Sequence, residues 1–598
     1  MAYRIEGRDI VIDGFENGIS DNPFEGFNQM KGVNIISTPG EASVSFGASN
    51  MAPNAWSGTI SSVDTGADTI TFTTVTGTVP RTGDSVTFTT SGGLPGGLSV
   101  STTYWLLSMG SDVYQVFTNM YLTGSQVNLT SSGSGTNTAT TITMGRVTQV
   151  EKNFGYVLDN NGRCWSPVSS STSTHSTVAF YRFMNNTITN ASGNGLVVYL
   201  STNGNYYLFV FRNAVIDYTS LGTLTPIQGG TTAISWVTGW QTMNTVAGSS
   251  ATHQAIIGQD NVVYYCDGQF VGSFREKVGS SFDPASSGTY TWTLQALALP
   301  KNERAICLAE QGTNLMVGGI QNFVYPWDRI SSSYKYPMLL AEKFINSMVT
   351  VNNSLYISAG SRGRIFISNG SNADLWVKIP DHISGTSDPI ISVFDLTYFK
   401  NQIYFGCLYG TTGTQSGTSY AGIWAVDVDT KALRTALISS TATSTTVAIC
   451  GVPTYVASTT GLSFTDINLI TFSYNFSTSV GIADTFISTP NAEYYTSIDT
   501  DMVPIGLFLT KRTFENVEWK TTKPLVSGEA IKISARTNLS ESYTLIKEWV
   551  YADQPLTTDV GNFNEINFEN AEWVQLRYEA KSTTASPSFV RLKELRLR

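Results

Sequence analysis

The chain has 598 residues and a formal net charge of −10, and only 13% of its residues are charged. A chain of this length is expected to hold about three to five domains. The acidic balance argues against a nucleic-acid-binding surface spread over the whole chain, because such surfaces are basic. The sequence has no run of about 18 apolar residues, which argues against a membrane-spanning helix. The start Met1–Glu6 lacks the apolar core of a signal peptide, so we expect a soluble protein made in a cytosol.

The residue types predict a fold built almost entirely from β-strands. Ser, Thr, Gly and Asn are frequent where charged residues would usually stand. These residues favour turns and extended chain over helix, since their side chains or their freedom compete with helical hydrogen bonding. Thr, Val, Ile and aromatic residues are also plentiful, and they suit a pleated, half-buried surface. The composition therefore predicts an all-β protein.

Residues 1–50 are predicted to form an N-terminal arm. Weak alternation between Tyr3 and Ile12 is followed by Gly14–Phe24, a segment rich in Gly, Asn and Pro that indicates a loop. Two further short strands follow. We expect this arm to join the propeller described below and to supply the strand that closes its ring.

Residues 51–146 are predicted to form an inserted decoration module, a small β-sandwich or barrel. Its short apolar strands are separated by turn signals at intervals of about 8–12 residues. The ordered series Gly83–Thr90, Leu94–Leu98, Thr102–Leu106 and Val113–Phe117 closely resembles a small β module that recurs as an insertion in phage tail and tail-fibre proteins. The resemblance implies a place on a virion surface and implies no chemistry.

Residues 147–504 contain a loose internal repeat of roughly 45–55 residues. Each copy has an apolar strand, a turn at Asn-Gly or a similar dipeptide, and two further strands. Copies are seen at 255–270, 306–327, 348–376 and 392–427, and the segments 155–165 and 196–211 follow the same rhythm. A single blade cannot bury both of its faces, whereas radial stacking around an axis buries them. The repeat therefore predicts a β-propeller-like body of about six to eight blades, with seven as the central estimate.

Residues 505–598 are predicted to form a C-terminal antiparallel β-sandwich. Apolar residues alternate cleanly with polar ones over 531–535 and 574–578, as in a sheet with one face in water. In the final segment the apolar alternation slips between Leu592 and Leu595, which predicts a β-bulge at 593–594.

The last strand also carries a row of basic residues with two interpretations. They form either the outer face of the strand or a contact to an acidic partner, the first being favoured. These residues are Arg591, Lys593, Arg596 and Arg598.

Cysteine and histidine positions give no sign of a metal or cofactor site. The cysteines are scattered without CxxC spacing, so buried free thiols are expected rather than a disulfide framework or a zinc site. They are Cys164, Cys266, Cys307, Cys407 and Cys450. The three histidines lie far apart in the sequence, at His175, His253 and His382. We expect no catalytic, cofactor-binding or metal-binding residue, and no GxxxxGK[ST] or HExxH motif is present.

One segment is similar in spacing to a known propeller turn. Residues Leu158–Trp165 match the Asp-box of sialidase-type propellers, Ser-x-Asp-x-Gly-x-x-Trp, with Leu158 and Asn160 in place of the Ser and the Asp. An Asp-box is a structural turn, so the likeness implies a propeller and no active site.

Several acids and tryptophans could in principle act on sugars. Paired carboxylates would suit glycoside hydrolysis, but each candidate stands beside turn residues and is interpreted as a turn-forming or solvated side chain. The candidates are Asp159, Asp260, Asp267 and Asp395. Trp236, Trp240 and Trp292 could stack on sugars, although core or interface packing is the favoured interpretation.

The order of the predicted parts is similar to that of the tail nozzle proteins of short-tailed bacteriophages. The stretch Gly18–Pro23 is similar to the Gly-Ile-Ser-x-x-Pro arm of some nozzle proteins, and Val590–Arg598 is similar in style to their final strand. The resemblance implies a virion structural protein of the tail, assembled in the host cytoplasm, with no catalytic residue and no cofactor.

The same resemblance implies a set of partners. Six copies would form a ring on the tail axis below the portal and its adaptor, extending the channel for DNA ejection. DNA would pass the acidic lumen without specific binding, because the phosphate attraction that holds DNA is missing. The inserted module would project outward and could contact tail fibres or the host cell surface.

Three alternatives remain open from the sequence. A receptor-binding tail fibre or spike has a similar composition, but it would usually show a coiled coil or a short-period repeat. A propeller glycosidase acting on host surface polysaccharide would cluster acids and aromatic residues on one face. A head-decoration or other minor capsid protein is the third alternative.

Overall fold

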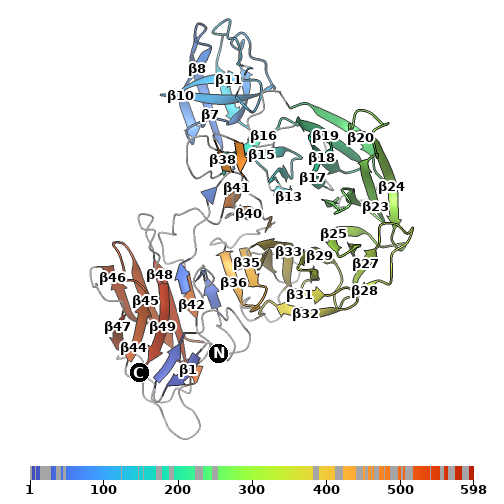
Figure 1. The fold of residues 1–598 in the computed structure, drawn as a ribbon. Helices are drawn as coiled ribbons and strands as arrows, with labels where there is room; N and C mark the ends of the chain where they lie inside the picture. The colour runs from blue at the N-terminus through green and yellow to red at the C-terminus, as the bar shows by residue number, and fades with distance from the viewer. Residues whose placement is uncertain are drawn as a thin grey trace.

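The computed structural model describes most of the chain between residues 52 and 438 and separate strands elsewhere. The described residues are 3–6, 9–13, 29–31, 33–34, 42–44, 49–50, 52–122, 124, 126–145, 147–151, 154–169, 178–186, 194–222, 234–244, 253–381, 390–399, 401–410, 422–438, 449–450, 456–458, 461–463, 471–476, 479–484, 496–499, 503–504, 516–538, 540–551, 558–562, 573–581 and 591–598. All regular elements in these ranges are β-strands, which confirms the all-β prediction. Figure 1 shows three parts: a small barrel, a ring of sheets and a sandwich that contains both chain ends.

The inserted module is a closed six-stranded barrel with the strand order β10-β11-β8-β7-β12-β9. Its strands are β7 (Trp56–Asp64), β8 (Thr69–Gly77), β9 (Ser85–Thr90), β10 (Thr103–Gly110), β11 (Val113–Phe117) and β12 (Asn137–Thr141). Alternate residues point inward along each strand, so Ile70, Phe72, Val86 and Phe88 are buried together in its core. Closure leaves no free sheet edge, which makes a barrel of this size stable as a unit.

The ring consists of seven four-stranded antiparallel sheets within the described residues, here called blades 1 to 7. Blade 1 contains β13 (Val147–Val150), β14 (Val157–Asp159), β15 (Cys164–Ser169) and β16 (Val178–Phe183). Blade 2 contains β17 (Asn194–Leu200), β18 (Tyr206–Arg212), β19 (Val215–Gly222) and β20 (Trp236–Thr242). Blade 3 contains β21 (Ala255–Ile257), β22 (Val263–Asp267), β23 (Phe270–Glu276) and β24 (Tyr290–Ala298). Blade 4 contains β25 (Ala305–Gln311), β26 (Asn314–Gly319), β27 (Phe323–Trp327) and β28 (Met338–Leu339).

The later blades follow the same plan, and blade 7 takes one strand from the N-terminal arm. Blade 5 contains β29 (Ile345–Val351), β30 (Ser354–Ala359), β31 (Arg364–Ser368) and β32 (Ala373–Lys378). Blade 6 contains β33 (Ile390–Phe399), β34 (Gln402–Gly410), β35 (Gly422–Asp427) and β36 (Leu433–Ile438). Blade 7 contains β37 (Ile449–Cys450), β40 (Thr471–Phe476), β41 (Ser479–Asp484) and β6 (Ser49–Asn50), in that order. A small hairpin of β38 (Val456–Ser458) and β39 (Gly461–Ser463) lies between its first two strands in sequence. These sheets confirm the propeller-like body, and their number falls within the expected range.

Neighbouring blades pack face to face through apolar side chains, which is why the repeat needs a ring. Phe209 of blade 2 lies 4.8 Å from Phe274 of blade 3, ring centre to ring centre, within one buried cluster. Similar clusters join blade 3 to blade 4 and blade 4 to blade 5. The first strand of each sheet lies beside the first strand of the next, so these strands surround the axis.

The N-terminal arm divides between two parts of the molecule. Among the described strands of the arm, β6 alone joins a sheet of the propeller, where it pairs with β41 as the fourth strand of blade 7. The earlier strands β1 (Tyr3–Glu6), β2 (Asp9–Ile12), β3 (Gln29–Lys31), β4 (Val33–Asn34) and β5 (Ala42–Val44) belong to the sheets of the sandwich. The sequence pattern placed the whole arm with the propeller. It could not show the division because strand pairing between distant segments leaves no local signature.

The sandwich contains a seven-stranded sheet and a six-stranded sheet. The first has the order β1-β2-β49-β44-β47, with β5 also paired to β49 and β4 to β5; the second has the order β3-β42-β48-β45-β46, with β43 also paired to β48. Their further strands are β42 (Thr496–Asp499), β43 (Val503–Pro504), β44 (Asn516–Thr521), β45 (Ala530–Arg536), β46 (Thr544–Val550), β47 (Thr558–Asn562), β48 (Trp573–Lys581) and β49 (Arg591–Leu597). Because β42 and β43 pair with β48, residues 496–499 and 503–504 lie in the sandwich, although the sequence pattern assigned them to the propeller.

The predicted bulge in the last strand is confirmed. Lys520 of β44 faces Glu594, and the next residue, Thr521, faces Leu592, so Lys593 is the extra residue. The bulge returns the alternation to the correct face, since Leu592, Leu595 and Leu597 are all buried.

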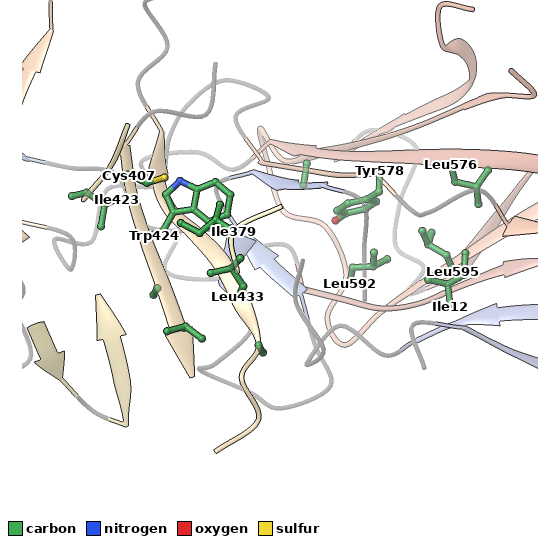
Figure 2. Packing of buried hydrophobic residues seen from close by; sticks show 14 of the residues in the cluster. Ile12, Ile379, Cys407, Ile423, Trp424, Leu433, Leu576, Tyr578, Leu592 and Leu595 are labelled. Carbon is green, nitrogen blue, oxygen red and sulfur yellow. The ribbon is translucent and has the colours of Figure 1, made fainter. Parts of the chain in front are cut away.

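One apolar cluster runs from the sandwich into blades 5 and 6. Figure 2 shows Trp424 of blade 6 and Ile379 on one side, with Tyr578 and Leu592 of the sandwich on the other. The strands β3 and β4 lie beside β36, the outer strand of blade 6. A shared core fixes the sandwich against the propeller, because separating the two would expose buried apolar surface to water.

The barrel is also fixed to the propeller, beside blade 1 (Figure 1). Trp105 of the barrel is buried in a cluster with residues of blades 1 and 2, and its Nε1–H donates to the carbonyl of Phe183 at 3.2 Å. From blade 1, the buried Arg182 donates from Nη1 to the carbonyl of Met120 at 2.6 Å.

Replacing Trp105 with Ala is expected to release the barrel from blade 1, since it removes the largest apolar contact between them. Large aromatic-to-Ala changes in cores cost about 3–5 kcal/mol. Calorimetry should then show a barrel transition separated from that of the propeller, at lower temperature than in the parent chain. Met109→Ala on the same strand is the control, because Met109 is 56% exposed. A single unchanged transition in Trp105→Ala would contradict this account of the docking.

Replacing Glu529 with Gln is expected to stabilise the protein in mildly alkaline solution. Glu529 is 2% exposed, its Oε2 accepts one hydrogen bond from the Val526 amide, and its Oε1 has none. Burial raises the pKa of this carboxyl to about 7 from an ordinary 4.5, despite that hydrogen bond. A raised folded-state pKa contributes stability below the unfolded value, and the contribution is lost as pH rises through about 7.

The gain for Glu529→Gln should therefore be near zero at about pH 4.5 and approach about 3 kcal/mol at about pH 8.5. Urea unfolding followed by tryptophan fluorescence measures it, since Trp519 and Trp549 are buried in the same sandwich. Glu579→Gln on β48, a half-exposed position, should give no such pH dependence. Equal stabilisation by Glu529→Gln at both pH values would contradict a raised pKa for the Glu529 carboxyl.

Candidate functional site: the axial channel

One hollow of the propeller lies on its axis and is here called the axial channel. Its lining comes from the first strands of blades 1 to 6 and the residues beside them, and it encloses about 490 Å³. The polar side chains of the lining are Thr148, Gln149, Glu151, Gln254, Asn346, Ser347 and Asp395. Because each first strand pairs only with the second strand of its own blade, its other edge faces the axis without a partner strand.

Side chains from neighbouring blades satisfy some of these edge groups. Gln254, just before the first strand of blade 3, accepts a hydrogen bond from the Leu308 amide of blade 4 through Oε1 at 2.7 Å. Ser347 of blade 5 accepts one from the Leu396 amide of blade 6 through Oγ at 3.0 Å. Each bond links two blades at the axis and satisfies an amide that would otherwise lack a strand partner.

The second of these bonds lies at a bulge in β33. The register of β33 with β34 shifts between Phe394 and Thr397, and Asp395 has a φ of 50°. Positive φ is uncommon for a residue with a side chain, although Asp tolerates it better than most. The bulge turns the Leu396 amide toward Ser347 and brings Asp395 into the lining of the channel.

The charged lining residues are both acidic. Glu151 is buried, and its Oε2 accepts a hydrogen bond from the Phe154 amide at 2.5 Å. Asp395 is the other charged group in the described lining. The described lining therefore has no cation that would attract phosphate groups, and a backbone amide holds the Glu151 carboxylate.

Asp159 forms a turn, as the sequence analysis interpreted the carboxylates that stand beside turn residues. Its Oδ1 accepts hydrogen bonds from the amides of Asn161 and Arg163 at 2.8 and 2.9 Å. Its Oδ2 accepts from the amide of Gly145 at 2.8 Å and from Nε1 of Trp165 at 3.0 Å. With four donors around it, this carboxylate holds the β14–β15 turn and the entry of the chain into blade 1.

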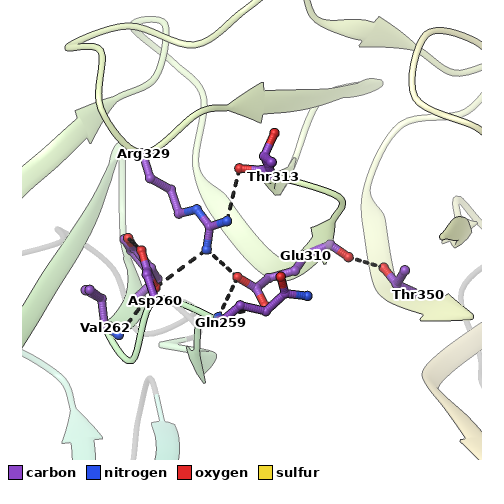
Figure 3. Close-up of polar contacts among 8 residues, drawn as sticks. Gln259, Asp260, Val262, Glu310, Thr313, Arg329 and Thr350 are labelled. Atoms are coloured by element: carbon purple, nitrogen blue, oxygen red, sulfur yellow. Dashed lines mark hydrogen bonds and ion pairs between the residues drawn. The ribbon is translucent and has the colours of Figure 1, made fainter.

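Asp260 belongs to an ionic cluster that joins blades 3, 4 and 5 (Figure 3). Arg329 forms ion pairs with Glu310 and with Asp260, the latter at 3.5 Å, and donates to the Thr313 carbonyl at 3.0 Å. Glu310 also accepts from the Gln259 amide at 3.0 Å.

The same cluster reaches blade 5, because the Thr350 hydroxyl donates to the carbonyl of Glu310. Only 11% of the Arg329 side chain and 16% of that of Glu310 are exposed, so little solvent screens this pair. The sequence pattern does not single out Arg329, Glu310 or Gln254. They carry no motif, and the contacts of Gln254 with Leu308 and of Glu310 with Gln259 join segments more than 50 residues apart in sequence.

Asp267 and His253 lie at the junction of blades 2 and 3. Asp267 is buried and accepts hydrogen bonds from the amide and the side-chain Nδ2 of Asn244 at 2.7 and 2.8 Å. His253 is also fully buried, with both ring nitrogens 2.7 Å from backbone carbonyl oxygens. His175 and His382 lie outside the described residues.

The three tryptophans singled out in the sequence take part in packing. Trp236 donates from Nε1 to the Met184 carbonyl at 3.0 Å, and Trp240 donates to the Pro284 carbonyl at 2.7 Å. Trp292 donates to the hydroxyl of Tyr265 at 2.9 Å. Each ring packs against a buried cluster, with its polar atom bound to a protein acceptor, as aromatic residues in cores require.

The described cysteines are buried, and two basic residues of the last strand form ion pairs. Cys164, Cys266, Cys307 and Cys407 are free and buried, and burial raises the pKa of the Cys164 and Cys266 thiols well above the ordinary value. The side chain of Cys450 lies outside the described set. Arg596 pairs with Glu594 at 3.0 Å and Arg598 with Glu518 at 2.7 Å, along the outer face of the last strand.

Among the described residues, no group of three or more His, Cys, Asp or Glu side chains is arranged to hold a metal ion. The described part of the chain also has no helix long and apolar enough to cross a bilayer.

Comparison with known proteins identifies similar folds and no family. Neither a protein-family model nor a curated protein sequence matches the chain. Among solved structures, a complex described as "YCF48 bound to D1 peptide" is 11% identical and aligns with 57% of this chain and 92% of its own, with a TM-score of 0.34. The computationally designed Ika8 protein is 12% identical, with 57% and 97% coverage and a TM-score of 0.32. The propeller-like fold therefore rests on the strand pairing described above.

Replacing Arg329 with Met is expected to lower the free energy of unfolding by about 2–4 kcal/mol, because Glu310 would keep a largely buried charge without its partner. Chemical denaturation of the two chains measures the difference. Lys378→Met is the matched control. Its ion pair with Asp381 is short at 2.6 Å, but the side chains are 35% and 49% exposed, so a loss below about 1 kcal/mol is expected. Equal losses in both variants would contradict a buried, stabilising ion pair between Arg329 and Glu310.

Proposed function

We propose that this protein is a structural subunit of a virion, in the tail nozzle of a short-tailed bacteriophage. The proposal begins from the resemblance of Gly18–Pro23 and of the last strand to nozzle proteins, and from the likeness of the inserted module to insertions in phage tail proteins. A barrel, a propeller and a sandwich in this chain order are what that resemblance leads one to expect. In this role the chain would serve as a mechanical part and not as an enzyme.

The main structural support for the proposal is the way in which the two ends of the chain join the barrel, the propeller and the sandwich. Strand β2 pairs with β49, the last strand, through Ile10 opposite Leu597 and Ile12 opposite Leu595. Strand β6 completes blade 7, and the chain then enters the barrel before it begins blade 1. A force on the sandwich, the barrel or the propeller is thus transmitted through paired backbone and a shared core, as a channel subunit requires.

The roles of the polar residues agree with such a part. Asp159 and Asp267 accept hydrogen bonds that hold turns and blade connections, and Arg329 links blades. The acidic residues of the axial channel are bound to backbone amides or placed at a bulge. The contacts of these side chains stabilise the fold. This supports a structural function over a hydrolytic one.

The proposed assembly is a homohexameric ring in the virion tail, formed in the host cytoplasm. A closed ring needs two different complementary faces on each subunit, and a body with a barrel beside blade 1 and a sandwich beside blade 6 offers unlike surfaces. The ring would adjoin the head-to-tail adaptor and surround DNA during ejection. A net charge of −10 suits a lumen that DNA passes without binding. The barrel would face tail fibres or the host surface.

Electron microscopy of the purified full-length chain and of the virion that contains it tests this proposal. We expect six-fold rings, located on the tail axis below the adaptor. A trimer at the end of a fibre would instead indicate a receptor-binding protein, and copies spread over the capsid would indicate head decoration. A monomer that shortens host polysaccharide would indicate a glycosidase. Any of these three results would overturn the nozzle assignment.

A further inference from the structure

A second hollow lies where the barrel meets blade 1 and is here called the junction cleft. It encloses about 500 Å³. Thr87 of β9 and Thr103 of β10 line it from the barrel, and Arg163 and Phe183 line it from blade 1. Thr143, in the connection between the two parts, also lines it. Small-molecule sites commonly have this size and are often found between two folded parts of a chain.

The contacts that fix the barrel to blade 1 also fix the walls of the junction cleft. Trp105 of the barrel donates to the carbonyl of Phe183 at 3.2 Å. On the blade 1 side, Arg163 donates from Nη1 to the carbonyl of Thr143 at 2.8 Å, which ties the β14–β15 turn to the connection from the barrel. A preformed cleft loses little conformational freedom when a ligand enters, and this favours binding.

Arg163 is the charged residue of the described lining, and most of its donors are unused. A guanidinium carries five N–H donors in one plane. Among the described residues the half-buried Arg163 side chain donates at Nη1 alone. Asp159, four residues away, accepts from the Arg163 backbone amide and not from the guanidinium. A cation with free donors on the wall of a cleft suits a carboxylate or a phosphate, which a guanidinium binds through paired hydrogen bonds.

Hydroxyl groups surround this cation on the barrel side. Thr87 and Thr103 lie opposite each other on the paired strands β9 and β10, so their side chains share the outer face of the barrel. The inward positions on β9 belong to Val86 and Phe88. The hydroxyls of Thr87, Thr103 and Thr143 have no hydrogen-bond partner within the described part of the chain. Because a hydroxyl both donates and accepts, these groups suit a ligand that carries hydroxyls of its own.

We propose that the junction cleft binds an acidic sugar, with its carboxylate or phosphate on Arg163 and its hydroxyls on Thr87, Thr103 and Thr143. An apolar ligand would remove these polar groups from water without giving them partners, which costs free energy. A bare anion would occupy the guanidinium and leave the hydroxyls unused. A sugar that carries an anionic group satisfies both.

The role of the junction cleft is binding and not hydrolysis. Its described lining contains no Asp or Glu side chain, whereas glycoside hydrolysis ordinarily needs a pair of them. The cleft is also formed within a single chain, so this inference does not depend on the proposed place in a phage tail.

Calorimetric titration of the full-length chain with glucuronate, glucose 6-phosphate and glucose tests the proposal. The three probes share a hydroxyl-bearing ring and differ in the charged group. We expect one or both acidic sugars to bind, and glucose to bind at least about tenfold more weakly, because it lacks the charge-assisted hydrogen bonds to Arg163. Failure of both acidic sugars to bind would overturn the proposal, as would equal binding of glucose. Acetate or inorganic phosphate binding as tightly as the acidic sugars would overturn the assignment to a sugar.

Replacing Arg163 with Met locates the site. We expect Arg163→Met to weaken association with the acidic sugar by about tenfold or more, since the group that pairs with the anion is lost. Arg275→Met is the matched control, because Arg275 is an exposed arginine on β23 of blade 3 and should not affect binding. Unchanged association in Arg163→Met would place the sugar elsewhere and overturn the proposal.

Replacing Thr87 with Val gives a second test that leaves the Arg163 contact with Thr143 intact. The variant removes one hydroxyl from the cleft and should weaken association by about two- to tenfold, the range for one neutral hydrogen bond. Thr291→Val, at an exposed position on β24, should leave association unchanged. If Thr87→Val binds the acidic sugar as the parent chain does, the assignment of the hydroxyls to the ligand is wrong.

A comparison of galacturonate with its trimer distinguishes a free sugar acid from a polysaccharide as the source of the ligand. Ser101 and Asn185 line the cleft and are exposed, so its mouth is open to further sugar units. Tighter association of the trimer, lost in Arg163→Met, would indicate a polysaccharide. Equal association of the two would indicate a free sugar acid.

Discussion

The rest of this structure depends on how the unpaired inner edges of the blades are hydrogen-bonded. A four-stranded blade buries its two faces against its neighbours, but the free edge of its first strand still faces the axis. Hydrogen bonds from one blade to the next satisfy part of that edge, as Gln254 does for Leu308 and Ser347 does for Leu396. These bonds form only when the neighbouring blade is in place, so the blades of the ring depend on one another.

The same dependence explains where charge is buried. The cluster of Arg329, Glu310 and Asp260 lies where blade 4 meets blade 3 and not in the centre of a single sheet. Apolar contacts such as Phe209 with Phe274 supply most of the surface removed from water, but they constrain direction weakly. Charged and polar contacts have defined geometry, and we interpret them as fixing how far one blade is rotated against the next.

Local pattern was enough to predict the fold class, the repeat and several details. The alternation at Ile531 and Ile533 and the slip between Leu592 and Leu595 correspond to buried faces and to a real bulge, because both depend on residues close in sequence. Local pattern could not show that β6 belongs to blade 7 or that β42 belongs to the sandwich, since those pairings join segments more than 70 residues apart. The contact of Gln254 with Leu308 also joins distant segments, which lie 54 residues apart in sequence, and local pattern does not show it. The proposed place in a phage tail rests on the resemblance of short segments to nozzle proteins.

The pairing of the first strands with the last has a consequence for synthesis. Ribosomes release the N-terminal strands first, and domains generally fold in the order in which they emerge. The barrel can close as soon as residue 141 is available, since its six strands are consecutive. Strand β6 must wait for β41, and β2 must wait for β49 at the very end of the chain. Until residues 595–597 have been synthesised, the nascent protein therefore carries unpaired strand edges, and the cell has to keep them from pairing with other chains.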